Sequence, residues 1–184
     1  MTYRYLTVSN FISASRIIIV IPMGYCLLTE FPHHRLWTIG VILVAVATDF
    51  LDGFLARKLH QVTEIGKIID PLADKIGIGV YAILLAITGD VPLWFVVFVL
   101  LRDLLIFSGG LYIHRNKRIV PQSNWPGKIS VSCVAVTFFL ATLRMDALNR
   151  LLTYSLWGSV VVMVWSSWSY AQRLFIGRNV DITK

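Results

Sequence analysis

Four aspartates stand out in the sequence because their spacing would place them as two pairs on two helices. Asp49 and Asp52 are three residues apart, and Asp70 and Asp74 are four residues apart, so each pair shares one face of an α-helix. The segment between the pairs is short, which would make the two helices antiparallel neighbours and bring the four carboxylates together. Carboxylates so close repel one another unless cations neutralise them, and divalent cations such as Mg²⁺ or Mn²⁺ prefer oxygen ligands. We therefore predict a divalent-metal site formed by these four residues.

Small residues and one arginine accompany the acids. Gly53 and Ala56 follow on the face of the first pair, and Gly66 precedes Asp70 by one turn, so that a ligand or a second helix could approach the backbone closely. Arg57 adds a permanent cation suited to bidentate phosphate binding. The simpler alternative is that the acids only form ion pairs at the membrane surface with the nearby bases Arg57, Lys58, Lys67 and Lys75.

The composition indicates that these residues belong to an integral membrane protein. Of the 184 residues, 57% are hydrophobic and 15% are charged, whereas a soluble domain of this size carries about a quarter charged residues. Six apolar segments, near residues 11–29, 36–56, 67–88, 92–114, 127–144 and 149–172, each approach the length of a transmembrane helix, about 20 residues. Runs such as residues 36–48 lack the alternation of β-barrel strands. We predict an all-α integral membrane protein with six transmembrane helices, forming a single domain over residues 1–184.

The distribution of bases predicts how the chain is oriented. With six spans, twelve Lys and Arg residues fall on the side of both termini and only Arg35, Arg144 and Arg150 fall on the other. Bases accumulate on the cytoplasmic side, so we expect both termini in the cytoplasm. Residues 1–10 could form a short segment lying in the membrane interface.

The stretch that contains the acids resembles the signature of the CDP-alcohol phosphatidyltransferases. It begins Asp49-Phe-Leu-Asp-Gly-Phe-Leu-Ala-Arg57 and, after eight residues, continues Gly66-Lys-Ile-Ile-Asp70-Pro-Leu-Ala-Asp74. Eight fixed residues over 26 positions rarely arise by chance. The length and the six spans are also similar to this family, so the resemblance covers nearly the whole chain.

A second element lies ahead of the first span. Asn10, Ser13 and Arg16 resemble a further family motif, in which Thr is commoner than this Ser. The substitution keeps the hydroxyl group.

The resemblance implies transfer of a phosphatidyl group from CDP-diacylglycerol to an alcohol, with release of CMP. By motif position, the four aspartates would bind two divalent cations, and Asp74 would also be the base that removes the acceptor's hydroxyl proton. The positions carried over to the nucleotide site are Gly53, Ala56, Arg57 and Gly66, together with Asn10 and Ser13. The resemblance also implies a homodimer in a bacterial cytoplasmic membrane, with the active site facing the cytoplasm and no nucleic acid as partner.

The acceptor is predicted from cations elsewhere in the chain. Glycerol 3-phosphate needs basic residues for its phosphate, and Arg102 and Lys128 are the best candidates, with Arg16 and Arg115 as helpers. A charge inside a span is costly unless it is paired or functional, so Arg102 either binds phosphate or forms an ion pair with Asp103 or another acid.

Two acceptors within the family stay open, as does a different class of protein. Residues 71–75 and the pair Gly127-Lys128 resemble the phosphatidylglycerophosphate synthases, whereas Arg102-Asp103 is more like the cardiolipin synthases, whose acceptor is phosphatidylglycerol. Another CDP-alcohol phosphatidyltransferase is a further possibility. A divalent-cation transporter would carry its acids near the middle of its spans and show internal symmetry, whereas the four aspartates here fall at the cytoplasmic ends of predicted spans and no repeat is visible.

Overall fold

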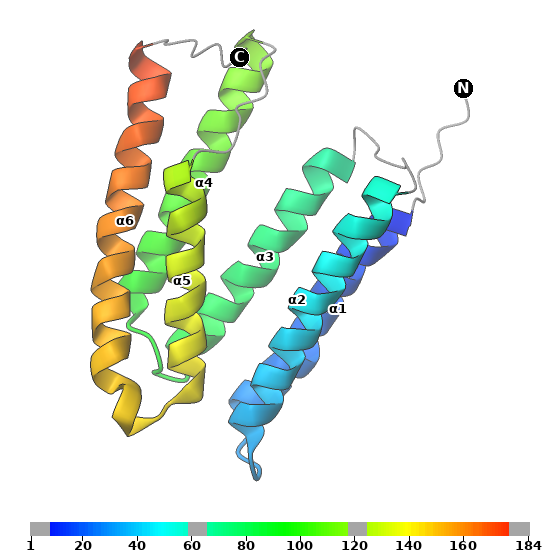
Figure 1. Ribbon diagram of the computed structural model, residues 1–184, viewed down its shortest axis with the longest axis vertical. Helices are drawn as coiled ribbons and strands as arrows, with labels where there is room; N and C mark the ends of the chain where they lie inside the picture. Colours follow the sequence, from blue (N-terminus) through cyan, green and yellow to red (C-terminus); the bar gives the residue numbers. More distant parts are fainter. Residues whose placement is uncertain (1–7, 59–65, 118–124, 177–184) are drawn as a thin grey trace. The chain divides into compact units, whose positions relative to one another are not determined.

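The computed structural model describes residues 8–58, 66–117 and 125–176, and the side chains of residues 18–48, 75–110 and 125–172. All regular structure in these residues is helical, as predicted. The helices are α1 (Val8–Leu28), α2 (His34–Lys58), α3 (Gly66–Ile87), α4 (Leu93–Lys117), α5 (Trp125–Leu143), a short 3₁₀ turn η1 (Asp146–Leu148) and α6 (Asn149–Ile176). Each α-helix overlaps one predicted apolar segment, and most helix ends lie within three residues of the prediction. The predicted interfacial segment, residues 1–10, falls mostly outside the described residues, and Val8 already begins α1 (Figure 1).

The chain divides into two compact units, and the first contains α1, α2, α3 and residues 141–144. Helix α1 packs against both α2 and α3. Met23 and Leu27 of α1 and Leu85 of α3 are buried in this unit. A Cβ atom added to Gly24 would lie 3.4 Å from Leu84 Cδ1, so a small residue at this position allows α1 and α3 to approach closely.

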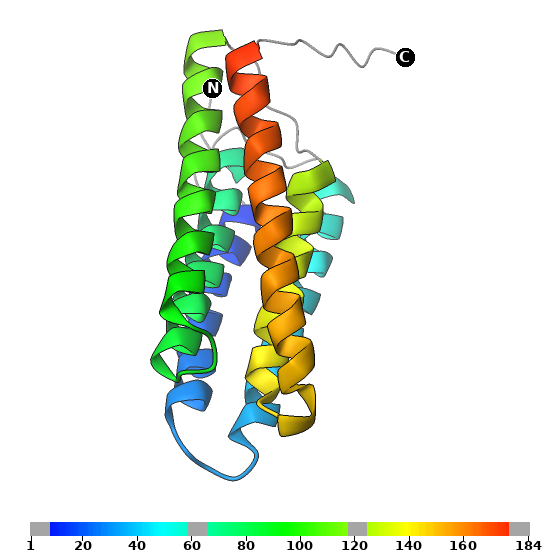
Figure 2. The same ribbon diagram turned by 90° about the vertical axis from the view of Figure 1, so that its left-hand side faces the viewer.

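The second unit contains α4, most of α5, η1 and α6. In Figure 2, α4 (green) and α6 (orange to red) are the helices nearest the viewer. Phe95 of α4 is fully buried and meets Phe138 of α5 edge-on, with ring centroids 6.2 Å apart. The Thr137 hydroxyl of α5 hydrogen-bonds to the hydroxyls of Ser155 and Ser159 of α6, at 2.8 and 2.9 Å. Aromatic packing and hydroxyl hydrogen bonds therefore hold these helices together.

Three apolar segments of the described chain are long enough to cross a membrane. They are Leu93–Gly110, Trp125–Leu143 and Asp146–Gln172. Large apolar side chains on these helices, among them Leu105, Val161 and Trp168, are more than half exposed, which is what a lipid environment permits. The described parts of α1, α2 and α3 contain shorter apolar stretches, Ile18–Leu28, His34–Thr48 and Lys75–Ile87. That all six helices span the membrane stays a prediction.

Candidate active site

The helices place both predicted aspartate pairs at one end of the first unit. Asp49 and Asp52 lie in the last three turns of α2, and Asp70 and Asp74 lie in the first three turns of α3. Figure 1 shows the end of α2 and the start of α3 at the same end of this unit. The backbone thus gives the antiparallel arrangement that the metal-site hypothesis requires. The side chains of these four residues lie outside the described ones, so metal ligation stays a prediction.

The other residues carried over from the family motif sit on the same helices. Gly53, Ala56 and Arg57 follow the first acid pair in α2, and Gly66 begins α3. Asn10, Ser13 and Arg16 lie in the first three turns of α1, which starts at the acid-bearing end of the unit (Figure 1). Their side chains, like that of Arg115 near the end of α4, are outside the described part of the chain.

Arg102 is a buried cation in the middle of α4. Its side chain is 8% exposed. One terminal nitrogen donates to Asp103 Oδ1 at 2.7 Å, and the other donates to Ser166 Oγ of α6 at 2.9 Å. The ion pair with Asp103, one of the two predicted alternatives, is therefore present. Arg102 Nε is buried and has no hydrogen-bond partner among the described residues.

The start of α5 lies beside this arginine. A Cβ atom added to Gly127 would lie 3.8 Å from Ser166 Oγ and 3.7 Å from Tyr170 Cε2. Lys128 comes next, exposed, with its ammonium 5.7 Å from the centre of the Trp125 ring. Ser130 is fully buried, and within the described structure its hydroxyl has no partner. Through Ser166 the fold brings Gly127, and with it the start of α5, next to Arg102.

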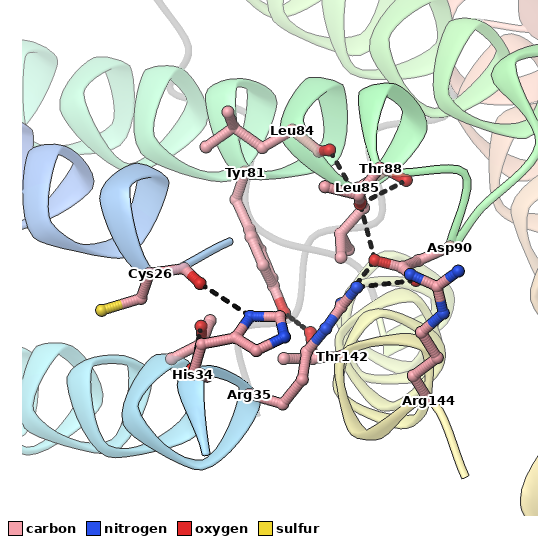
Figure 3. A network of polar contacts seen from close by, with 11 residues as sticks. Cys26, His34, Arg35, Tyr81, Leu84, Leu85, Thr88, Asp90, Thr142 and Arg144 are labelled. Carbon is pink, nitrogen blue, oxygen red and sulfur yellow. Dashed lines mark hydrogen bonds and ion pairs between the residues drawn. The ribbon is translucent and has the colours of Figure 1, made fainter. Parts of the chain in front are cut away.

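A second polar cluster, which the sequence did not reveal, lies at the other end of the first unit (Figure 3). The Asp90 side chain is 1% exposed and accepts hydrogen bonds from both terminal nitrogens of Arg35, at 2.5 and 3.2 Å. Thr88 Oγ1 donates to the same carboxylate at 2.6 Å, and Arg144 Nη1 lies 3.5 Å from it. We call Arg35, Thr88, Asp90 and Arg144 the Asp90 cluster. It is a buried carboxylate with two cations.

Further polar contacts surround this cluster. His34 Nδ1 is 3.0 Å from the carbonyl oxygen of Cys26, which joins the end of α1 to the start of α2. Tyr81 of α3 hydrogen-bonds to Thr142 of α5 (Figure 3). The helix ends on this side of the unit are thus linked through side chains as well as through the chain itself.

The structure thus combines apolar helices with an acidic motif whose four residues all lie at one end of the first unit. The chain belongs to the CDP-alcohol phosphatidyltransferase family, whose model matches residues 6–165. The resemblance predicted from the aspartate motif is confirmed. The protein is accordingly a membrane-associated phosphatidyltransferase, of a family that uses CDP-diacylglycerol and an alcohol acceptor and that generally depends on a divalent metal.

The named relatives include both phosphatidylglycerophosphate synthases and a cardiolipin synthase. A protein of Aquifex aeolicus (strain VF5), named CDP-diacylglycerol–glycerol-3-phosphate 3-phosphatidyltransferase, is 32% identical over 168 residues, covering 89% of this chain and 92% of the relative. A Mycobacterium tuberculosis (strain H37Rv) protein named probable phosphatidylglycerophosphate synthase is 33% identical over 145 residues, covering 76% of this chain and 68% of the relative. A Mycobacterium bovis protein that carries the name of a cardiolipin synthase is 32% identical over 103 residues, covering 56% of this chain and 48% of the relative.

Proposed function

We propose that this protein transfers the phosphatidyl group of CDP-diacylglycerol to glycerol 3-phosphate, giving phosphatidylglycerophosphate and CMP. The observation that carries the choice of acceptor is the pairing of Arg102 with the Gly127-Lys128 start of α5 through Ser166. A buried arginine beside the start of the helix that carries Lys128 suits a phosphate monoester, which brings two negative charges and three terminal oxygens. The relatives named for this activity are similar to most of the chain, which supports the same acceptor.

Arg102 and Lys128 would play different parts in binding the acceptor. Arg102 is fixed by Asp103 and Ser166, so its guanidinium charge would be held in a set place. Lys128 is exposed and less constrained, and would supply a mobile point charge. Arg16 and Arg115 are proposed as helpers from α1 and α4.

The four aspartates fit the divalent metal on which the family generally depends. Their carboxylate oxygens are hard ligands, and the backbone places two of them at the end of α2 and two at the start of α3. Two Mg²⁺ or Mn²⁺ ions held there would neutralise the diphosphate of CDP-diacylglycerol and assist the departure of CMP. Gly53, Ala56 and Gly66 would leave room for the nucleotide, and Arg57, Asn10 and Ser13 would contact it.

Asp74 is the proposed base for the transfer. It would accept the proton of the acceptor hydroxyl while that oxygen attacks the phosphorus that bears the diacylglycerol. A new oxygen–phosphorus bond forms, and the bond from this phosphorus to the oxygen shared with CMP breaks, so that CMP leaves with the electron pair. Acyl chains can stay in lipid throughout because only the headgroup reacts.

The position in the cell and the assembly belong to the same proposal. The excess of bases on the side of both termini supports a multi-pass protein with its acid-bearing helix ends in the cytoplasm. Bacterial relatives support a bacterial cytoplasmic membrane, and the family resemblance supports a homodimer.

Cardiolipin synthesis is the second candidate, and the Arg102–Asp103 ion pair is the observation that favours it. A neutralised arginine suits the single negative charge of phosphatidylglycerol better than the two charges of a phosphate monoester.

The test is release of CMP from CDP-diacylglycerol by the purified protein in detergent, with Mg²⁺ or Mn²⁺ and one acceptor at a time. We expect glycerol 3-phosphate to support turnover and phosphatidylglycerol to support little. The reverse preference would replace the proposal with cardiolipin synthesis. If neither acceptor supports CMP release, the acceptor is another alcohol.

A further inference from the structure

The Asp90 cluster lies at the end of the first unit that is remote from the four aspartates. Arg35 belongs to the first turn of α2, and Thr88 and Asp90 directly follow α3. The paired hydrogen bonds between Arg35 and Asp90 (Figure 3) therefore tie the start of α2 to the end of α3. These are the two helices whose other ends carry the acids.

The turn after α3 holds Asp90 in a fixed place. Gly89 has a left-handed backbone, with φ of 72°, which glycine adopts without strain. Its N–H donates to the carbonyl of Ala86, and the N–H of Asp90 donates to the carbonyl of Leu85. This pair of bonds is the Schellman pattern that ends a helix. The carboxylate is thus attached rigidly to α3, and its movement would require this cap to open.

Similar lengths of helix separate the tie from the acids on the two helices. Asp49 follows Arg35 by 14 residues, and Asp74 precedes Ile87, where α3 ends just before Asp90, by 13 residues. At a rise of about 1.5 Å per residue, both acids lie roughly 20 Å along their helices from the end that carries the tie. Asp52 follows Arg35 by 17 residues and Asp70 precedes Ile87 by 17 residues, or roughly 26 Å. Because α2 and α3 run in opposite directions, Asp49 lies at about the same height along the helix axes as Asp74, and Asp52 at about the same height as Asp70.

We propose that the Asp90 cluster is a positioning device that sets the axial register of α2 against α3, so that the two aspartate pairs reach the same level. Arg35 and Asp90 are then positioning residues for the metal site, although they lie far from it. A slip of α2 by one residue would displace its acids by about 1.5 Å, which is large compared with the tolerance of metal–oxygen distances. This inference rests on the proposed function, because it presupposes that the four aspartates bind metal.

The test measures the binding of Mn²⁺ alone to the purified, metal-free protein in detergent, by the loss of the free-ion electron paramagnetic resonance signal. Arg35→Gln removes the two-nitrogen contact with Asp90. We expect the Kd for Mn²⁺ to rise about tenfold, the low end of the range for residues that orient metal ligands. Arg35→Lys keeps the charge, and we expect it to restore part of the affinity. The KM for glycerol 3-phosphate, measured at saturating metal, should change less than about twofold.

Tyr81→Phe is the matched control. It breaks the Tyr81–Thr142 hydrogen bond in the same region and removes neither of the hydrogen bonds between Arg35 and Asp90. Thermal unfolding of each variant in the presence of a chelator reports any general loss of stability. Tyr81→Phe should lower the unfolding temperature without changing the Kd for Mn²⁺, whereas Arg35→Gln should change the Kd.

Four results would count against the proposal, and those that overturn the positioning role are distinguishable from the one that overturns the metal site. An unchanged Kd in Arg35→Gln, or an equal change in Tyr81→Phe, would overturn the positioning role and leave the proposed function standing. A wild-type protein that binds no Mn²⁺ would overturn the metal site itself and the inference with it. If Arg35→Gln does not fold, Thr88→Val takes its place, since it removes one hydrogen bond to Asp90. We expect this variant to raise the Kd for Mn²⁺ about threefold. An unchanged Kd would again overturn the positioning role.

Discussion

Replacing Lys128 by Gln gives the cleanest test of the proposed acceptor site. The lysine is exposed, and the contact that the structure gives it is the Trp125 ring, 5.7 Å from the ammonium. A cation–π contact at an exposed site contributes about 0.5–1 kcal/mol. Gln keeps most of the side-chain length, so the variant should fold and unfold within a few degrees of the wild type.

The effect on catalysis should be much larger than the effect on stability. A charge-assisted bond to phosphate contributes about 1.5–3 kcal/mol, which corresponds to roughly a ten- to hundredfold change in affinity. The contact would exist both before and during transfer, so its loss should raise the KM for glycerol 3-phosphate and leave kcat nearly unchanged. The KM for CDP-diacylglycerol should hardly move.

The assay is CMP release in mixed micelles, with each substrate varied at saturating concentrations of the other. Lys128→Arg keeps the charge and should stay within about threefold of the wild-type KM. Arg150→Gln removes another exposed positive charge and should leave both KM values unchanged. An unaltered KM for glycerol 3-phosphate in Lys128→Gln, or an equal rise for both substrates, would refute the placement of the acceptor phosphate at the start of α5.

Three further predictions concern the remaining parts of the molecule. Asp70→Asn should keep the fold and abolish turnover, because it removes a charged ligand at nearly constant volume; wild-type activity at limiting Mg²⁺ would exclude the two-metal assignment. Gly53→Leu should prevent CDP-diacylglycerol binding by filling the face next to Asp49 and Asp52, while the protein stays extractable in detergent; binding of CDP at the wild-type level, measured calorimetrically, would place the nucleotide elsewhere. Tyr81→Phe should lower the free energy of unfolding by about 0.5–1.5 kcal/mol through the lost bond to Thr142, and a denaturant titration showing no change would contradict this contribution.

The sequence predicted the helices well because apolar length is a local property. Each of the six segments needs only its own residues to define it, and α1–α6 each overlap one of them. The ends of the helices were predicted less accurately. Helix α4 continues to Lys117, three residues beyond the predicted end at residue 114. Charged residues such as Arg115 can extend a helix past its apolar part, so apolar content alone underestimates its length.

The candidate site was predictable in part. The aspartates were found because their spacing along helices is itself a signal. The family that this motif indicated is confirmed, whereas the role of the four residues as metal ligands stays a prediction. The Arg102–Asp103 pair was foreseen as one of two alternatives because the residues are adjacent. The Asp90 cluster was missed, since Arg35 and Asp90 are 55 residues apart and no periodic spacing links them. In the sequence analysis, Arg35 and Arg144 entered only the count of basic residues that predicted the orientation in the membrane.

The hydroxyl contacts between α5 and α6 have a consequence for how the chain is inserted during synthesis. The Thr137 hydroxyl also donates to the carbonyl of Cys133 in its own helix, so it has a partner before α6 arrives. A lone α5 can therefore enter lipid with the Thr137 hydroxyl already satisfied, and meeting Ser155 and Ser159 later adds only about 0.6 kcal/mol for each bond. Free-energy gains of this size do little to drive the association of the two helices. Their main effect is to determine which residues of α5 and α6 face each other. The last hairpin of the chain would thus dock in one register from two independently inserted helices.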